Sequence, residues 1–427
     1  MRYFRVSLII ALIVMVLSCD TNTKLASPAG NYFLKYLGGD GDQWGVDLEV
    51  YKDGTFFVLG NSRLTATSDQ QLYVAQVDAT GNLIWEKELG AAGTDEQARD
   101  IEITSDGNLI VAANVVTTAG NRDVFIVKLS TGGDILNSST LNVSPDSDEN
   151  VSTITEISDG FIVTGTKDVS STSISSPPHT KDAFHLRLTS DLALSTNIWR
   201  TTHGDGTVNA GVKVFEIDAN HFYFFGYTNS PFNKALTEDI NFSYWIFQLG
   251  STGEASSNSL YPGSVAYNET SSSVVQTSDG FAMAGTAATG SSNYLYLVKL
   301  NQNLSFNSSD YQFSHLFADN SDSDLGTFTN TEYSRTFVNL ASPSYYFVLT
   351  QQLKTDEQIY LTKIDNRGQY LWKEPVLFGG AGDDFAGAVE ELPDGRISVL
   401  GTITVGGSTG QKKIVLMKLN SAGKLTD

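Results

Sequence analysis

The sequence predicts an all-β chain, a seven-bladed β-propeller of four-stranded antiparallel blades, closed by an N-terminal strand that completes the last blade. Three observations lead to this prediction. One alternating strand pattern recurs seven times, Asp-Gly hairpins recur at regular spacing, and the last repeat ends where its fourth strand should begin. Because many small repeats can share one continuous core, 427 residues can form a single domain. We expect the propeller to occupy residues 32–427.

The first repeated element is a hairpin of two apolar runs joined by Asp-Gly. This dipeptide favours a tight hairpin turn, because residues there adopt a positive φ. Clear copies lie at residues 48–61, 101–114, 154–166, 274–286 and 389–402, and degenerate copies lie at 213–227 and 335–351. We expect these hairpins to be the first two strands of each blade, with the first strand nearest the axis.

The second repeated element is an alternating strand that ends in a polar and then an aliphatic residue. Its seven copies end at Val77, Leu129, Leu188, Leu249, Leu300, Ile364 and Leu419. A fourth strand follows, most clearly at residues 83–90 and 370–380, but the last repeat stops before it. Residues 32–39 have the missing pattern at the other end of the chain, which predicts ring closure and protects the sheet edges.

The complete repeat pattern, GG-x-G-D followed by the Asp-Gly hairpin, D-x-[YF]-[LIV]-x-K-[LI] and Trp, covers nearly all of residues 32–427. It resembles the bacterial seven-bladed β-propeller repeats (SBBP-like repeats) of secreted and surface proteins. The resemblance implies the fold. It does not imply one function, because propellers host unrelated activities.

The N-terminus has the features of a secretory signal. Arg2 and Arg5 precede an apolar run from Val6 to Leu17, which is too short to span a bilayer. Val16-Leu17-Ser18-Cys19 resembles the bacterial lipobox, which implies cleavage before Cys19 and attachment of a diacylglycerol to its sulfur. Residues 1–18 are then a lipoprotein signal peptide, and residues 19–31 are the lipidated cysteine and a flexible tether. The alternative is an ordinary signal peptide with an incidental cysteine.

Composition limits the location and the partners. We expect a lipid-anchored membrane protein outside the cytoplasm, in the outer membrane facing the periplasm or the cell surface. Cys19 is the only cysteine, so disulfides are excluded. The net charge of −21 repels phosphate backbones, so we expect no nucleic-acid partner. We expect a monomer.

The long loops predict a binding face. Up-and-down strand order places the short turns of every blade on one face (the tight-turn face) and the remaining loops on the opposite face (the long-loop face). The longest loops, at residues 167–181, 228–243 and 317–331, belong to the long-loop face, where rigid scaffolds usually carry binding sites. Acidic and aromatic residues near strand starts on this face are the candidate ligand-binding residues: Asp42, Trp44, Asp95, Glu96, Asp148, Glu149, Tyr244, Glu269, Asp383 and Asp384.

These carboxylates have two interpretations. If they converge at the mouth of the central channel, they could hold Ca²⁺, a cation that prefers oxygen ligands. Asp322 and Asp324 lie in a run that is loosely similar to a calcium loop, but the loop glycine and terminal glutamate are missing. Alternatively, a recurring Asp at a strand start caps a backbone turn. Calcium is therefore a weak expectation, and no other cofactor is expected.

Three functions are compatible with the sequence. The first is a non-catalytic envelope or surface protein that binds a glycan, peptide or protein partner through the long-loop face. The second is a carbohydrate-active enzyme with channel-mouth carboxylates as acid and base. The third is a structural component of an envelope assembly. No catalytic motif is present, so no catalytic residue is assigned. His185 occupies a position that is apolar in other repeats (Ile126, Leu297), which predicts a core histidine.

Overall fold

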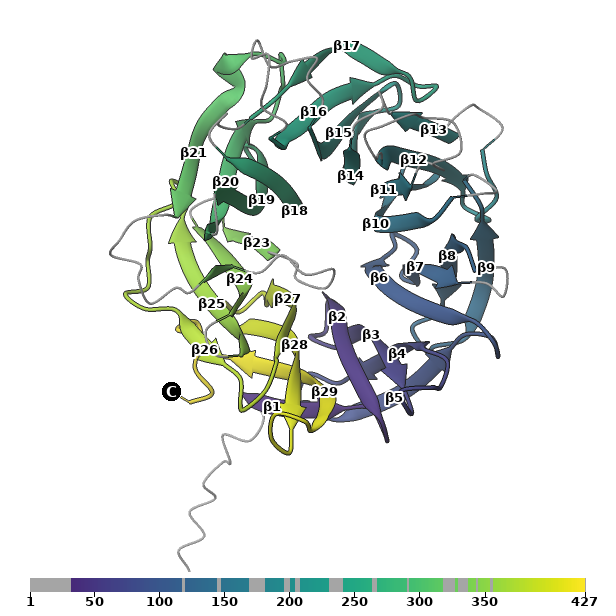
Figure 1. Cartoon of the computed structure of the whole chain (residues 1–427), viewed down its shortest axis with the longest axis vertical. Coiled ribbons are helices and arrows are strands. Elements are labelled where there is room, and N and C mark those ends of the chain that lie inside the picture. The colour runs from purple at the N-terminus through teal and green to yellow at the C-terminus, as the bar shows by residue number, and fades with distance from the viewer. Residues whose placement is uncertain are drawn as a thin grey trace, which may run out of the picture.

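The computed structural model describes residues 32–426 except 117–119, 144–146, 169–180, 196–199, 204–207, 230–240, 263–266, 290–291, 318–326, 329–336, 343–344 and 354–355. Within these residues the chain is all-β, with one 3₁₀ turn at Ser308–Asp310 and no α-helix. The strands form seven antiparallel sheets arranged around a central axis (Figure 1). The predicted seven-bladed propeller is confirmed.

Each of the first three blades follows the expected inner-to-outer order. Blade 1 is β2 (Asp42–Val50), β3 (Phe56–Arg63), β4 (Gln71–Val77) and β5 (Leu83–Leu89). Blade 2 is β6 (Asp95–Ile103), β7 (Leu109–Val116), β8 (Arg122–Leu129) and β9 (Ile135–Leu141). Blade 3 is β10 (Glu149–Ile157), β11 (Gly160–Asp168), β12 (Lys181–Thr189) and β13 (Arg200–His203).

The next three blades continue the ring. Blade 4 is β14 (Asn209–Asp218), β15 (His221–Thr228), β16 (Ser243–Leu249) and β17 (Ala255–Leu260), and blade 5 is β18 (Asn268–Thr277), β19 (Gly280–Thr289), β20 (Ser292–Asn301) and β21 (Tyr311–Phe317). Blade 6 has two short inner strands, β22 (Thr327–Phe328) and β23 (Phe337–Ser342), which both pair with β24 (Tyr345–Leu353). It continues with β25 (Glu357–Asp365) and β26 (Val376–Phe378).

Blade 7 joins the two ends of the described chain. It consists of β27 (Phe385–Glu391), β28 (Ile397–Val405), β29 (Gln411–Leu419) and, as its outer strand, β1 (Phe33–Leu37). β1 is antiparallel to β29, with Phe33 opposite Lys418 and Leu37 opposite Ile414. The predicted closure is confirmed. Because β1 begins beside the end of β29, the preceding residues join the propeller at the tight-turn face.

The Asp-Gly turns have the backbone that the sequence requires. Gly54, Gly107 and Gly395 have φ values of 82°, 79° and 80°, and the Asp53 carboxylate accepts the Thr55 N–H at 2.9 Å. The turn aspartate also explains the polar residue that recurs in the third strand. Lys128, Arg187 and Lys299 each form an ion pair at 2.7 Å, with Asp106, Asp159 and Asp279 respectively. The repeated Asp and the repeated cation are therefore two halves of one contact.

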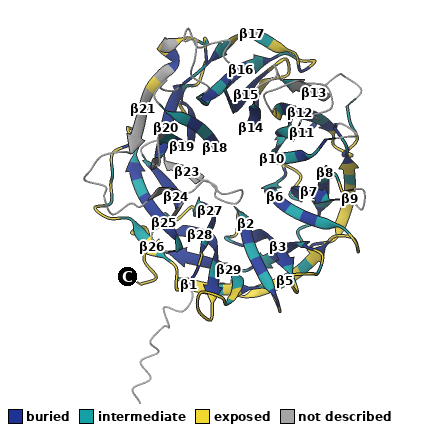
Figure 2. Cartoon of the chain, viewed as in Figure 1, coloured by how far each residue is buried: buried dark blue, intermediate teal, exposed yellow. Residues whose placement is uncertain are grey.

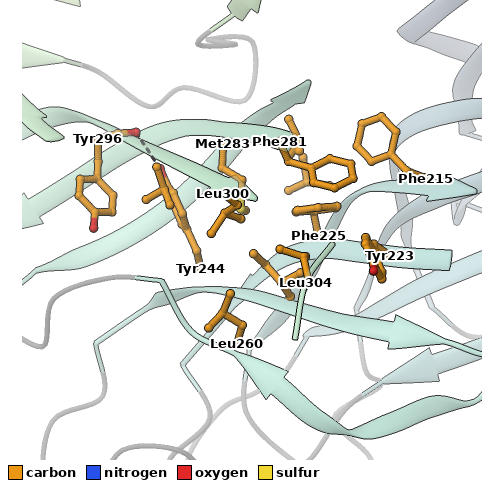
Figure 3. Packing of buried hydrophobic residues seen from close by; sticks show 14 of the residues in the cluster. Phe215, Tyr223, Phe225, Tyr244, Leu260, Phe281, Met283, Tyr296, Leu300 and Leu304 are labelled. Carbon is orange, nitrogen blue, oxygen red and sulfur yellow. Dashed lines mark hydrogen bonds between the residues drawn. The ribbon is translucent and has the colours of Figure 1, made fainter. Parts of the chain in front are cut away.

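The core lies in the seams between neighbouring blades, because both faces of each sheet pack against another sheet. The middle strands are accordingly buried almost throughout, while the outer strands alternate between exposed and half-buried side chains (Figure 2). Figure 3 shows the seam of blades 4 and 5, where Phe225 and Phe281 have ring centroids 5.0 Å apart. Each blade thus depends on its neighbours for burial.

Candidate functional site

The first acid of each long-loop motif connects neighbouring blades. The Oδ1 atoms of Asp42, Asp95, Asp148 and Asp383 accept backbone N–H groups of Lys412, Gln70, Arg122 and Glu357 at 2.9, 2.6, 2.9 and 3.1 Å. Every one of these N–H groups lies at the start of the third strand in the preceding blade. Asn268 does the same for Phe242 at 3.0 Å. These side chains, which we call inter-blade clamps, support the capping interpretation.

The second acid of the motif is buried. Glu96, Glu149, Glu269 and Asp384 are at most 2% exposed, and blades 1 and 4 have the amides Gln43 and Asn209 at the same position. The Asp384 carboxylate accepts the N–H groups of Gly380 and Thr404, both at 2.7 Å. Burial raises the pKa of Asp384 despite these hydrogen bonds, and burial likewise raises the pKa of Glu96. These buried side chains hold the backbone of the loop that connects two neighbouring blades.

The glycines of the motif make room for the buried acid. A Cβ atom on Gly90 would lie 2.2 Å from the Glu96 Oε2 atom. A Cβ atom on Gly379 would lie 2.5 Å from the Asp384 Oδ2 atom. A side chain at either glycine would force the buried carboxylate to move, so the recurring Gly and the recurring acid pack as one unit.

Asp384 provides a direct test of this role. Replacing it with Ala leaves two buried N–H groups without their acceptor, so we expect a loss of about 2–4 kcal/mol in the free energy of unfolding. Urea denaturation followed by tryptophan fluorescence measures the change. The exposed neighbour Asp383 is the matched control, since Asp383→Ala removes one acceptor at 3.1 Å and should cost less than about 1 kcal/mol. Equal effects of the two substitutions would contradict the assigned role.

The aromatic candidates differ in their surroundings. Trp44 is half-buried on β2. Tyr244 is fully buried in the seam of blades 4 and 5, and its hydroxyl donates to the Tyr296 carbonyl at 3.0 Å (Figure 3). Tyr244 is therefore a core side chain that does not reach the surface of the long-loop face.

Several predicted residues lie outside the described part of the chain. They include Cys19, Asp322, Asp324 and most of the three longest loops. Among the described residues, no group of three or more His, Cys, Asp or Glu side chains is arranged to hold a metal ion. That same part of the chain contains no helix with the length and hydropathy of a membrane span.

A β-bulge in the inner strands creates contacts that the sequence did not predict. The register shifts between Gly45 and Asp47 in β2 and between Ala98 and Asp100 in β6, and comparable shifts occur in β10, β14, β18 and β27. A β-bulge changes the direction in which the neighbouring side chains point. Asp47 and Asp100 accept N–H groups from the inner strand of the next blade, at Ile101 (3.0 Å) and Ile154 (2.7 Å).

Carboxylates gather on one side of the central channel. Glu49, Glu102 and Glu390 occupy the same position in blades 1, 2 and 7, each four residues before the Asp of its hairpin turn. Burial, together with the nearby carboxylates of Glu390 and Asp47, raises the pKa of Glu49 well above its ordinary value. Lys213 forms an ion pair with Glu102 at 3.1 Å. In the sequence, the constant spacing of four residues between each Glu and the Asp of its hairpin turn was the signal for this cluster.

A cavity of about 460 Å³ lies between blades 1 and 2 beside the loop at Gly90. The equivalent seam, between blades 7 and 1, differs in its side chains. There the Tyr73 hydroxyl donates to Glu86 at 2.6 Å, and the pocket beside Glu86 is smaller, about 310 Å³, whereas blade 2 has Phe125 and Ser138 at these positions. The lining of the larger cavity is mainly apolar and includes Leu89, Val115, Phe125, Val127, Ser138 and Thr140.

Comparisons with known proteins find similar solved structures but no related family. No family model and no curated protein matches the chain. Solved structures match at low identity: the plexin A4 extracellular region (9% identity, TM-score 0.49, 92% of this chain and 47% of that one) and the β-propeller domain of the Trilobed protease from Pyrococcus furiosus (10%, 0.47, 90% and 98%). Bacillus subtilis levansucrase matches at 10% identity and a TM-score of 0.35, covering 70% and 89%. The chain spans about half the length of the plexin structure.

Proposed function

We propose that this chain is a lipid-anchored bacterial envelope protein with SBBP-like repeats, and that its propeller is a non-catalytic module binding a peptide or protein partner. The anchor is supported by the lipobox-like residues that end at Cys19. Binding without catalysis is supported by the engagement of the long-loop acids, because the clamps and the buried acids already accept backbone N–H groups.

One observation carries the choice of partner: the cavity between blades 1 and 2. Leu89, Val115, Phe125, Val127 and Ile135 give the cavity a mainly apolar interior. Its polar groups are the hydroxyls of Thr94, Ser138 and Thr140 and the carboxylates of Glu88 and Glu96. A mainly apolar pocket with a few polar groups selects an apolar side chain, which can carry a donor for a carboxylate beside it, whereas a sugar would place many hydroxyl groups against apolar walls. A peptide with one large apolar residue fits this chemistry best.

A repeat-swap variant tests the proposal. Phe125→Tyr together with Ser138→Glu places the larger, polar pair of the equivalent positions in blade 1 (Tyr73 and Glu86) inside the cavity. Peptides selected on the wild-type chain from a random heptapeptide library should contain a large apolar residue and bind the variant at least about tenfold more weakly, as expected when an apolar anchor loses its pocket. Ser139→Glu, on the other face of β9, is the control and should bind normally. Peptides that bind both variants equally, or binding to glycans alone, would contradict the proposal.

A second candidate function rests on Glu49. A carboxyl whose pKa is raised by burial and by neighbouring carboxylates has the arrangement of a general acid with a neighbouring base. Hydrolysis of glycoside substrates by the wild-type chain, lost in Glu49→Gln but retained in the repeat-swap variant, would favour this enzyme function over binding.

A further inference from the structure

Large apolar side chains are exposed along one side of the ring. The structure describes twelve such residues, and eight lie on or next to the outer strands of four consecutive blades, 6, 7, 1 and 2. They are Leu371, Leu377, Leu34, Tyr36, Leu83, Ile84, Ile135 and Leu136, between 40% and 57% exposed. Figure 2 shows exposed segments on β1, β5 and β9 along this part of the rim.

The fold does not require these side chains to be apolar. On the same strands the alternate residues make the seam contacts: the Phe33 ring packs on Phe56 at 5.8 Å, and the Trp85 Nε1 atom donates to the Thr131 carbonyl at 2.9 Å. Blade 4 shows that large apolar residues are not needed. The small Ala255 occupies the position of Leu83, since each pairs with the last residue of the third strand, and the polar Asn258 is also exposed. Large apolar side chains exposed on consecutive blades are typical of an interaction surface.

The tether joins the propeller within this patch. Residues 20–31 separate Cys19 from the described chain, and β1, which follows at once, itself carries Leu34 and Tyr36. Twelve extended residues reach about 40 Å at most. A lipid on Cys19 would hold this side of the ring close to the bilayer, so even a weak contact would be occupied for much of the time.

We propose that the outer rim of blades 7 and 1, formed by Leu34, Tyr36, Leu83 and Ile84, rests in the headgroup region of the lipid bilayer. This inference depends on the proposed lipid anchor. Aliphatic side chains partition into the boundary of the acyl chains, and tyrosine is favoured at the level of the headgroups. The charged neighbours include both signs (Lys35, Lys87, Glu86 and Glu88), which matches a zwitterionic headgroup layer. The propeller then stands on its edge, and its long-loop face opens sideways along the membrane.

Depth-dependent quenching tests the contact. Lipidated chains, expressed with their own signal and carrying Leu83→Cys or Ala255→Cys, are labelled with bimane and reconstituted in phosphatidylethanolamine–phosphatidylcholine vesicles containing 5-doxyl lipid. Lipidation blocks Cys19, so the new thiol alone reacts. The label at residue 83 should be quenched at least about twofold more than the label at residue 255, because only blade 1 faces lipid. Equal quenching in vesicle-bound protein would overturn the contact while leaving the anchor intact.

A polar variant separates the contact from the anchor. Leu83→Ser with Ile84→Ser should remain with the vesicles through its lipid but lose the preferential quenching of a bimane label at Leu34→Cys. Leu64→Ser is the matched control, since Leu64 is 63% exposed on the long-loop face of the same blade, and should leave quenching unchanged. Unchanged quenching in the double variant would overturn the contact. Release of unmodified, lipid-free chain from the vesicles would overturn both the anchor and the contact.

Discussion

Replacing Leu37 with aspartate is expected to open the ring. Leu37 is 4% exposed on β1, opposite Ile414, and packs in one cluster with Phe33, Phe56 and Tyr73 at the seam of blades 7 and 1. A carboxylate at this position has no cation to pair with in that apolar cluster, so we expect a loss of about 4 kcal/mol or more in the free energy of unfolding. Detachment of β1 would also expose the edge of β29, which promotes association.

Urea denaturation and size-exclusion chromatography measure these effects. Tyr36→Asp is the matched control, because Tyr36 is the next residue of the same strand and 53% exposed. It should change stability by less than about 1 kcal/mol and leave the elution volume unchanged. If Leu37→Asp unfolded at the same urea concentration as the wild-type chain, β1 would not be the closing element.

Acidification is expected to destabilise the seam of blades 3 and 4 through two buried histidines. The rings of His185 and His203 stack at 5.0 Å, and the His203 ring lies 4.9 Å from that of Phe247. His185 is fully buried and bonded to the Gly253 carbonyl at 3.1 Å, so the prediction of a core histidine is confirmed. Burial and the neighbouring His203 lower the pKa of His185 to about 3, and burial lowers the pKa of His203 to about 4.

The direction of the pH effect on stability follows from proton linkage. The unfolded chain takes up these protons near pH 6.5, whereas the folded chain does not, so stability is complete above pH 6.5 and falls as the pH decreases towards 4. Between pH 7 and pH 5 each histidine contributes a loss of about 2 kcal/mol, or about 4 kcal/mol for the pair.

His185→Leu tests this assignment, because Leu297 occupies the equivalent position in blade 5. The variant should lose about half of the pH dependence between pH 7 and 5 in urea titrations of unfolding. His221→Leu is the control, since His221 is exposed and bonded to Asp218 at the surface. A pH dependence that survives His185→Leu and His203→Phe together would rule out the pair as its source.

The fold could be predicted because its determinants are local. The Asp-Gly turn, the alternation of the third strand and the permuted strand at residues 32–39 each depend on a few neighbouring residues. Repetition makes the turn visible in five copies and the third strand in seven. The role of the acidic residues was harder to predict from the sequence. Asp95 and Glu96 are adjacent in the sequence, yet the first clamps the preceding blade and the second is buried under its own loop.

Features that depend on residues from more than one strand or blade could not be predicted from the sequence of a single repeat. The cavity is lined by Phe125 and Ser138, where blade 1 has a Tyr–Glu pair, and that pair is recognised as a contact only when two strands of one blade are placed in register. Similarly, Glu49 and Glu390 lie at opposite ends of the sequence, and ring closure is what places their charges together. A comparison of repeats position by position would have suggested the Glu cluster.

The closing strand has a consequence for how the ring folds. β1 is the first of the described strands in chain order, whereas its partner β29, which contains Lys418 opposite Phe33, is the last. Strands so far apart in the chain pair slowly, because the entropy of closing a long loop is lost before the contact forms. Until β1 pairs with β29, its backbone N–H and C=O groups lack their partners on that strand. Phe33 and Leu37 then also lack the hydrophobic cluster in which they are buried in the closed ring. We therefore expect closure of the ring by β1 to be a late folding step and the one most exposed to misassociation.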